Sequence, residues 1–294
     1  MTLEQLRIFV AVAEREHVTQ AARDLNLTQS ATSAAIAALE SRYAIQLFDR
    51  IGRRIVLSSA GRLFLAEARA VLARAEAAEL VLSDLAGLKI GSLSLAASQT
   101  VGNYWLPPLV TRFRTAFPGL SVTLSLGNTE TVAGWVKAGE ANIGLVEGEV
   151  DDPALVTSVI AEDEMSLIVS PGHRWAGADA TTLDFRTDDW VMRERGSGTR
   201  AILETVLREH GVDKATAALV LPSNEAVLNA VAAGHGAAVL SKLVVGPSVA
   251  AGRVVEIAYA FPRRTFSMVQ HRERFVTSAE KEFIRLVADT EPAP

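Results

Sequence analysis

The chain has 294 residues, of which 49% are hydrophobic and 21% are charged. This length and composition are typical of a globular protein with two or three folded units, and they exclude collagen-like and disordered chains. The chain has no cysteine, which excludes disulfide scaffolds, thiol catalysis and cysteine-ligated metals. Glu4, Arg7 and Glu14 interrupt the apolar stretch that a signal peptide needs, so we expect an unexported, cytoplasmic protein.

The net charge of −5 is unevenly distributed along the chain. Residues 1–58 carry seven arginines against six carboxylates, whereas residues 90–294 carry 18 lysines and arginines against 24 carboxylates. A broadly basic surface is therefore excluded. The charge permits only a local surface for nucleic acid, in the first segment.

The first segment, residues 1–58, has the spacing of a helix-turn-helix. Apolar residues recur every three or four positions from Leu3 to Ala13, which predicts a helix over residues 3–15. Thr19 is expected to cap a short second helix that ends near Leu25. Thr28 is expected to cap a third helix over 29–42, whose inward face includes Ile36 and Leu39.

Two short strand-like stretches, 47–50 and 55–57, follow this third helix. They flank a glycine turn that carries Arg50, Arg53 and Arg54. The pattern predicts a winged helix-turn-helix whose wing has a basic tip.

The apolar pattern of residues 59–89 predicts one long linker helix. Seven apolar residues step by four and three along it, which is the spacing of a coiled-coil seam; they are Phe64, Ala68, Val71, Ala75, Ala78, Leu82 and Leu85. We expect this helix to dimerise the chain. The alternative is a helix packed on its own domain, because three heptads are a short seam.

Residues 90–294 alternate apolar strands with helices, which predicts two α/β lobes built on parallel sheets. Strands are expected at 91–97, 120–126, 143–146, 165–170, 190–192, 217–221 and 237–240, and helices at 104–116, 129–138, 199–210 and 224–233. The first lobe is expected to hold about 90–162 with 269–294, and the second about 163–268. The whole chain is therefore expected to be of the α/β class.

The order and spacing of several motifs resemble the LysR-type transcriptional regulators over the whole chain. These motifs are LEQLRIF (3–9), VTQAARDLNLTQSA (18–31), LE (39–40), LFDR (47–50) and LSSAG (57–61). NYWLPP (103–108), GNTE (127–130), GLVEG (144–148) and GSGTR (196–200) are most similar to the branch with the carbon-fixation regulator CbbR and the sulfur-metabolism regulator CysL. The resemblance implies a winged helix-turn-helix, a dimerising linker helix, a two-lobed effector domain like that of periplasmic binding proteins, and often a tetramer.

A recognition helix reads bases with polar side chains near its start, while arginines hold phosphates. The candidates for double-stranded DNA are Arg23, Thr28, Gln29, Ser30, Thr32, Ser33, Arg50, Arg53 and Arg54. Thr28 also has a capping role, and Thr32 stands where the family often has an inward-facing valine. Ala34 and Ala35 stand where the family commonly has Arg and Gln, so we expect arginine–phosphate contacts and avidity to dominate the affinity.

Polar residues at the junctions between strands and helices are the candidates for a small-molecule effector. By resemblance, Ser98, Thr100 and Thr199 match the residues that line the effector pocket, and Asn128, Thr129, Glu147 and Arg195 lie nearby. Each hydroxyl or amide could instead cap a helix. Glu147 repels an anion unless an arginine pairs with it, so the charge of the polar or anionic metabolite stays open.

Two rival functions are an enzyme and a solute-binding protein. The stretch 195–199 lacks the order of a nucleophile elbow, and the histidines at 17, 173, 210, 235 and 271 show no metal-binding spacing. The acidic stretches 151–152 and 162–164 are interpreted as solvated loop. A solute-binding protein fits residues 90–294 but neither the winged helix nor the missing export signal. We therefore expect a regulator and no enzyme, without cofactor, metal or membrane partner.

Overall fold

The computed structural model describes residues 1–51, 54–85, 91–179, 182–186, 188–212 and 217–290. The chain divides into two compact units, Met1–Gly87 with Ala138–Glu140, and Leu88–Lys137 with Ala141–Pro294. Among the described residues, no helix combines the length and the apolar character that crossing a membrane requires.

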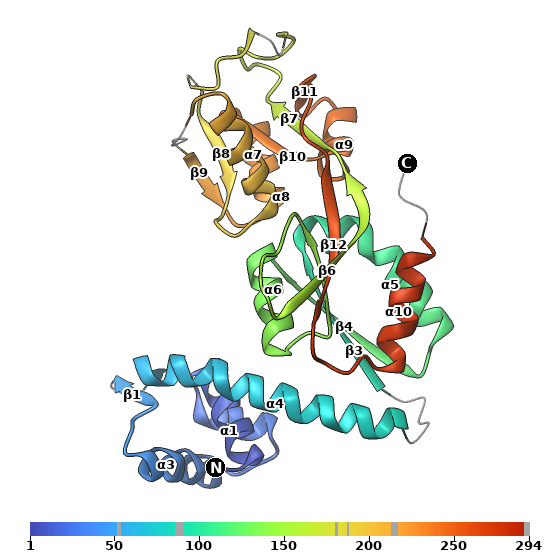
Figure 1. Ribbon diagram of the computed structural model, residues 1–294. Helices are drawn as coiled ribbons and strands as arrows, with labels where there is room; N and C mark the ends of the chain where they lie inside the picture. The colour runs from blue at the N-terminus through green and yellow to red at the C-terminus, as the bar shows by residue number, and fades with distance from the viewer. Residues whose placement is uncertain (52–53, 86–90, 180–181, 187, 213–216, 291–294) are drawn as a thin grey trace. The chain divides into compact units, whose positions relative to one another are not determined.

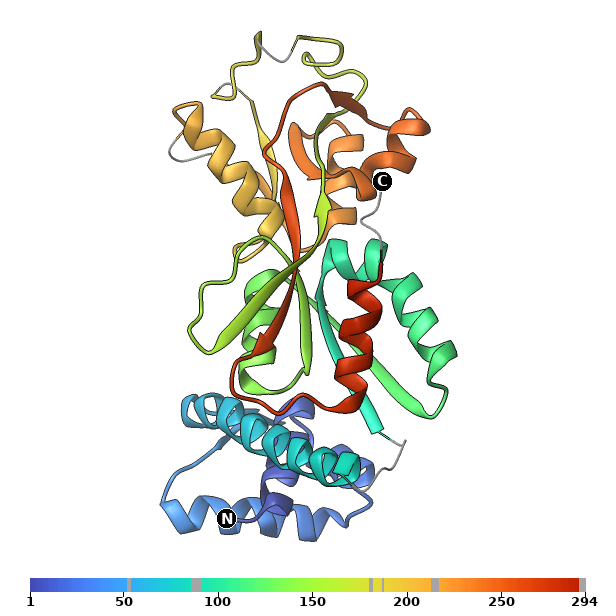
Figure 2. The same ribbon diagram turned by 45° about the vertical axis from the view of Figure 1, so that its right-hand side comes forward.

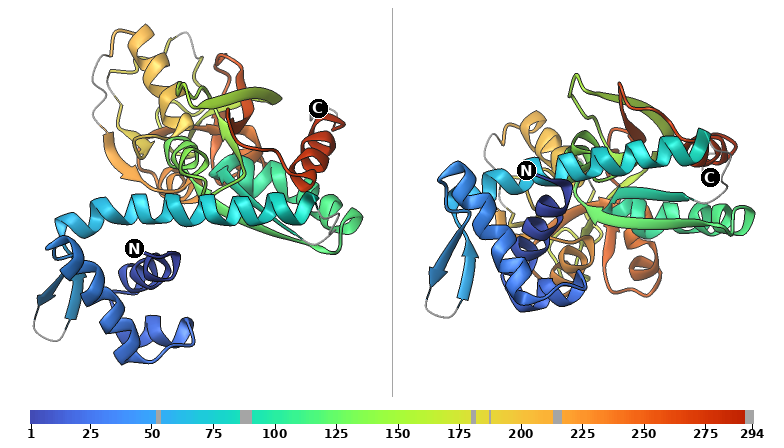
Figure 3. Two further views of the ribbon diagram at one scale, coloured as in Figure 1. Left: turned by 60° about the horizontal axis from the view of Figure 1, so that its bottom comes forward. Right: turned by 90° about the horizontal axis from the view of Figure 1, so that it is seen from below.

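The first unit contains three short helices, a hairpin and one long helix (Figure 1). They are α1 (Leu3–Arg15), α2 (Val18–Asp24), α3 (Gln29–Tyr43), β1 (Phe48–Ile51), β2 (Arg54–Leu57) and α4 (Ser59–Leu85). β1 and β2 pair antiparallel, with Ile51 opposite Arg54, and the hairpin projects beyond the helices of its unit in both views of Figure 3. The predicted helices and wing are confirmed.

The core of the first unit follows the predicted spacing, with two corrections. Phe9, Ile36 and Leu39 are buried as predicted, but Leu3, which the spacing placed on the inward face, is exposed. The predicted cap at Thr19 is wrong. His17 caps α2 instead, because its Nδ1 accepts the Gln20 N–H at 3.2 Å, and the helix begins one residue before Thr19.

The predicted seam of α4 serves two purposes. Ala68 is fully buried in the core of its own unit, and the Phe64 ring lies 4.9 Å from that of Phe9. Further along the helix, Val71 is 42% exposed and Leu82 is 68% exposed. The start of the seam therefore fixes α4 to its own helix-turn-helix, and the later residues leave an apolar face open to solvent.

The second unit contains two five-stranded sheets, each the centre of one lobe. The first sheet has the order β4-β3-β5-β12-β6, with β3 (Gly91–Ser98), β4 (Leu120–Gly127), β5 (Ile143–Glu147), β6 (Leu155–Asp163) and β12 (Arg264–His271). Its helices are α5 (Leu106–Ala116), entered through the π-helical turn η1 (Val101–Trp105), α6 (Thr129–Ala138) and α10 (Ser278–Ala288). α5 and α10 pack side by side on one face (Figure 2), and α6 covers the other.

The second sheet has the order β11-β7-β10-β8-β9. Its strands are β7 (Met165–Val169), β8 (Trp190–Arg193), β9 (Ala217–Leu221), β10 (Ala237–Ser241) and β11 (Val255–Ile257). α7 (Gly198–Glu209) packs on one face, and α8 (Asn224–Ala232) and α9 (Lys242–Ala250) pack on the other. Apolar strands buried on both faces are the pattern expected between two layers of helices.

The predicted parallel pairing is confirmed for β3, β4 and β5, but neither sheet is parallel throughout. β12 runs antiparallel to both β5 and β6, and β7 runs antiparallel to β10 and β11. The chain crosses between the lobes twice, from β6 into β7 and from β11 into β12. β12 begins at Arg264, so the return to the first lobe comes before the residue 269 that we expected. β6, β11 and β12 lack a helix-strand alternation, which is why the pattern missed them.

Candidate functional site

The start of α3 presents a polar face to solvent. Thr28 caps the helix by accepting the Ala31 N–H at 3.2 Å, and its hydroxyl lies 3.1 Å from that of Ser30. Gln29, Ser30 and Ser33 are exposed. A recognition helix is the second helix of a helix-turn-helix, here α3. It requires solvent-exposed amide and hydroxyl groups on its first turns.

Thr32 does not belong to this face, which corrects our prediction. Its side chain has no exposed surface, and its hydroxyl donates to the Thr28 carbonyl at 3.1 Å. On a helix, residue 32 lies about 100° from its neighbours at 31 and 33, so it points inward with Ile36 and Leu39. A base cannot reach it.

The structure describes the arginine candidates to different extents. Arg23 lies exposed in the last turn of α2. Arg50 and Arg54 belong to the paired strands β1 and β2, so their backbones are part of the hairpin. The side chains of Arg50 and Arg54, and Arg53 altogether, lie outside the described residues.

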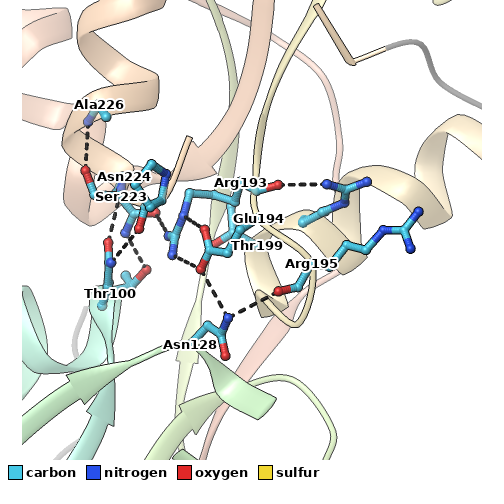
Figure 4. A network of polar contacts seen from close by, with 12 residues as sticks. Thr100, Asn128, Arg193, Glu194, Arg195, Thr199, Ser223, Asn224 and Ala226 are labelled. Carbon is cyan, nitrogen blue, oxygen red and sulfur yellow. Dashed lines mark hydrogen bonds and ion pairs between the residues drawn. The ribbon is translucent and has the colours of Figure 1, made fainter. Parts of the chain in front are cut away.

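The two lobes of the second unit meet through a buried polar network (Figure 4). The Asn224 amide at the start of α8 donates from Nδ2 to the Thr100 hydroxyl at 3.1 Å, and its Oδ1 accepts from the Arg193 guanidinium. Thr100, Arg193 and Asn224 are all buried. Thr100 belongs to the first lobe and the other two to the second, so these bonds join the lobes.

Glu194 extends the network toward α6. Its carboxylate accepts from Arg193 Nε at 2.8 Å and from Asn128 Nδ2 at 3.3 Å, and Asn128 also donates to the Arg195 carbonyl at 3.2 Å. In Figure 4 the Arg195 side chain extends away from Glu194 and Asn128. The Glu130 N–H donates to the Gly196 carbonyl at 3.2 Å, which adds a backbone bond between the lobes.

A second buried network lies where the chain crosses between the lobes. The Arg264 guanidinium pairs with Asp163 and donates to the Thr199 hydroxyl at 3.0 Å, and the Ser241 hydroxyl donates to Asp163 at 2.7 Å. The side chains of Arg264 and Asp163 are 0% and 1% exposed. The interpretation of 162–164 as solvated loop is therefore wrong at Asp163. Its carboxylate is buried because a buried arginine, 101 residues away in sequence, compensates its charge.

A cavity of about 960 Å³ opens between the lobes. Thr129 and Glu147 of the first lobe and Arg195 and Ser197 of the second are among the residues that line it. This volume is in the range of small-molecule sites in proteins. Three of our predicted effector residues therefore line this one cavity: Thr129, Glu147 and Arg195.

The remaining predicted residues do not line this cavity, and their side chains are already bonded. Ser98 donates to the Leu145 carbonyl at 3.5 Å, while Thr100, Asn128 and Thr199 take part in the two networks above. The bonds of Thr100, Asn128 and Thr199 join segments of the two lobes or of the crossing strands, whereas that of Ser98 stays within the first lobe.

One further bond between the lobes affects a titratable group. The Tyr104 hydroxyl on η1 donates to Glu225 on α8 at 3.2 Å. Burial raises the pKa of the Tyr104 phenol, and the charge and hydrogen bond of Glu225 raise it further. The phenol therefore stays protonated and remains a donor at neutral pH.

Sequence reasoning missed six side chains of these networks: Asp163, Arg193, Glu194, Asn224, Ser241 and Arg264. A signal existed for Arg193 and Glu194, because two charged residues directly follow the apolar strand Trp190–Met192. Arg264 and Asp163 are separated by the whole second lobe, and no local pattern joins them. Within the described parts of the chain, no group of three His, Cys, Asp or Glu residues could hold a metal ion.

Each of the two units matches a known protein family. Residues 3–62 match the family "Bacterial regulatory helix-turn-helix protein, lysR family", and residues 86–291 match the family "LysR substrate binding domain". The first match covers the helix-turn-helix and hairpin. The second covers the two lobes and their cavity.

Similar curated proteins extend over nearly the full chain. An uncharacterised HTH-type transcriptional regulator, YeiE of Escherichia coli K12, is 35% identical over 97% of this chain and 96% of its own length. CysL of Bacillus subtilis is 33% identical over 83% of this chain and 82% of its own, and CbbR of Rhodospirillum rubrum is 31% identical over 86% and 84%. The resemblance to the branch with CbbR and CysL is confirmed.

Solved structures agree with the architecture. CbnR, solved full-length with its target DNA, has a TM-score of 0.69 and is 23% identical over 98% of this chain and 99% of its own. The regulatory domain of Synechocystis CcmR, solved with 2-PG, has a TM-score of 0.62 and is 26% identical over 69% of this chain and 100% of its own. The helix-turn-helix, the two lobes and these relatives show that the chain belongs to the LysR family of transcriptional regulators, which are not enzymes.

Proposed function

We propose that this regulator binds double-stranded DNA through α3 and the β1–β2 hairpin, and that a small polar metabolite held between its lobes modulates this binding. As a regulator of bacterial genes it acts in the cytoplasm. The observation that carries the proposal is the exposed polar start of α3, with Gln29, Ser30 and Ser33 facing solvent on a family-matched helix-turn-helix.

The hairpin and Arg23 are proposed to hold phosphates beside this face. Arg50, Arg53 and Arg54 lie at or next to the hairpin turn, the part of a wing that meets the DNA backbone. CbnR, which shares the architecture, was solved with its target DNA. Ala34 and Ala37 are exposed on α3 and offer bases no hydrogen bond, so arginine–phosphate contacts carry much of the affinity.

The functional form is proposed to be a homodimer joined through α4, and two dimers form the tetramer that the family often uses. The exposed apolar residues Val71 and Leu82 support this, because an apolar stripe on a long helix is stable when a second helix covers it. In this proposal residues 1–58 bind DNA, 59–89 form the linker and 90–294 bind the effector.

The effector site is proposed to be the cavity between the lobes together with Ser98, Thr100, Asn128 and Thr199. CcmR, a relative in fold and sequence, was solved with 2-PG in its regulatory domain. A ligand that prefers one arrangement of the lobes shifts the population toward it, in proportion to its difference in affinity for the two arrangements. The linker helices then transmit this shift to the spacing of the DNA-binding units.

A mobility-shift titration tests the proposal. The probe is the intergenic DNA upstream of the gene, and the affinity is measured between about 50 and 200 mM salt. We expect specific retardation, with log K falling linearly against log salt by about 0.9 per phosphate contacted. A flat salt dependence contradicts the role of the arginines, and no retardation at any salt or with any metabolite contradicts DNA binding.

A further inference from the structure

The charges that line the cavity between the lobes do not balance. Among the described lining residues, Lys137 pairs with Asp152 at 2.7 Å and Arg200 pairs with Glu204 at 2.7 Å. The hydrogen bond from Lys137 lowers the pKa of Asp152, as such a pair requires. These four charges cancel in pairs.

The two remaining arginines of the wall near the crossing strands are also committed. Arg263 pairs with Glu162, and Arg264 pairs with the buried Asp163. Arg195 is then the one cation of the described lining that has no ion pair. Its side chain is exposed and free to meet a ligand.

Four lining carboxylates have no cation among the described residues: Glu130, Glu147, Glu149 and Asp151. Glu130, Glu149 and Asp151 are exposed, so water and salt screen their charge. Glu147 is 3% exposed, so water screens its carboxylate less than it screens the other three. The cavity is therefore negative overall.

The Glu147 carboxylate occupies one position that an oxyanion would use. Its carboxylate accepts the Thr100 N–H at 3.2 Å, at the start of the helical stretch formed by η1 and α5. Helix starts are the usual anion sites in folds of this kind. At the other helix start, a Cβ on Gly198 would lie 2.5 Å from the Glu147 carbonyl oxygen, so α7 begins directly against this residue.

We infer that the cavity takes a zwitterionic, amino-acid-like metabolite, with its ammonium group facing Glu147 and its carboxylate facing Arg195, and that Glu147 excludes simple oxyanions. This inference rests on the proposed effector site. A protonated amine supplies the missing counter-charge of the buried carboxylate, and the ligand's own carboxylate meets the one uncommitted arginine. Sulfate or a phosphorylated acid has no group that compensates Glu147.

The test measures ligand binding to the full-length protein by its tryptophan fluorescence melting curve and by calorimetry. The probes are the twenty common amino acids and ornithine, tested singly, with sodium sulfate and 2-phosphoglycolate as oxyanions. We expect at least one amino acid to raise the melting midpoint of the wild type and neither oxyanion to do so. If no amino acid stabilises the wild type, or if an oxyanion does, the inference is overturned.

Variants of Glu147 test its role directly. Glu147→Gln keeps the size and removes the charge, so we expect the amino-acid effect to disappear and the affinity for 2-phosphoglycolate or sulfate to rise at least tenfold. Glu273→Gln removes an exposed carboxylate that is not among the lining residues and should change either affinity by less than about twofold. No gain in oxyanion affinity in Glu147→Gln, or an equal gain in Glu273→Gln, overturns the inference.

Two controls keep the result interpretable. Glu147→Ala repeats the charge removal in case the glutamine variant does not fold, and the melting curve without ligand reports folding. Mobility shifts with both proteins separate the two proposals, because retardation without the expected ligand selectivity contradicts the inference alone. Absence of retardation by the wild type contradicts the proposed function itself.

Discussion

The start of α3 and the junction between the lobes both gather hydroxyl and amide side chains, but they hold them differently. Gln29 and Ser33 on α3 are exposed. Thr100 and Asn224 at the junction are buried and bonded to each other at 3.1 Å. The first surface is open to a partner, whereas the polar groups of the second already bond one another between the lobes. An exposed polar surface suits DNA binding, whereas bonds between the lobes suit a site whose ligand changes the arrangement of the lobes.

The largest effect is expected from the ion pair at the crossing strands. Arg264→Met leaves the Asp163 carboxylate buried without its partner, which costs about 3–5 kcal/mol of stability. The four tryptophans all lie between residues 105 and 190, so denaturant unfolding followed by tryptophan fluorescence reports on the second unit alone.

The neighbouring pair supplies the matched control. Arg263→Met breaks an ion pair whose side chains are 76% and 55% exposed, and such pairs contribute about 0–1 kcal/mol. Equal losses in the two variants would show that the buried pair has no special role. Combining Arg264→Met with Asp163→Leu should restore part of the loss, because the uncompensated charge is then gone.

The next effect concerns the open face of α4. Leu82→Glu places a charge on each copy of the proposed dimer seam, and we expect the dimer dissociation constant to rise at least tenfold, or about 1.4 kcal/mol. Sedimentation velocity measures this. Leu63→Glu is the control, because Leu63 is 77% exposed on α4 outside the seam. A wild type that sediments as a monomer at all concentrations contradicts the dimer.

A smaller effect is expected on α3. Gln29→Ala removes an amide that can bond a base in two places, which costs about 1–3 kcal/mol of specific DNA affinity. Thr32→Val is the control, since it alters a buried hydroxyl and should lower stability by about 1 kcal/mol without changing the affinity of the folded protein. Competition binding against non-specific DNA separates the two. Comparable losses of affinity would return Thr32 to the reading surface.

The smallest effect is expected from one bond between the lobes. Tyr104→Phe removes the hydrogen bond to Glu225 and costs about 0.5–1.5 kcal/mol. If this bond holds the lobes in the described arrangement, the variant also changes ligand affinity. Calorimetry with the tightest-binding amino acid of the panel checks this, and an unchanged affinity would assign the bond to stability alone.

The sequence predicted most of the helix-turn-helix because its signals are local. Helical spacing, the cap at Thr28 and the glycine between two arginine-bearing strands all lie within a few residues of one another. Thr19 and Thr32 show the limit of such signals. A β-branched hydroxyl residue near a helix start fits a cap, a core position or a contact surface, and only packing decides among them.

The junction between the lobes was predictable only in part. The polar residues after each strand pointed to Thr129, and the resemblance to the LysR family pointed to Glu147 and Arg195; all three line the cavity. The partners that bind one another across the junction are far apart in sequence: Thr100 and Asn224 are 124 residues apart. No local pattern of helices and strands joins such distant partners.

The pairing of β6 with β12 has a consequence for modularity. Asp163 and Arg264 are register partners, so the chain leaves the first sheet and re-enters it at adjacent points. In topological terms the second lobe is an insertion into the first, with its entry and exit side by side. A lobe from a relative could therefore be transplanted at this junction, provided that the graft keeps the aspartate, the arginine and the hydroxyls that meet them.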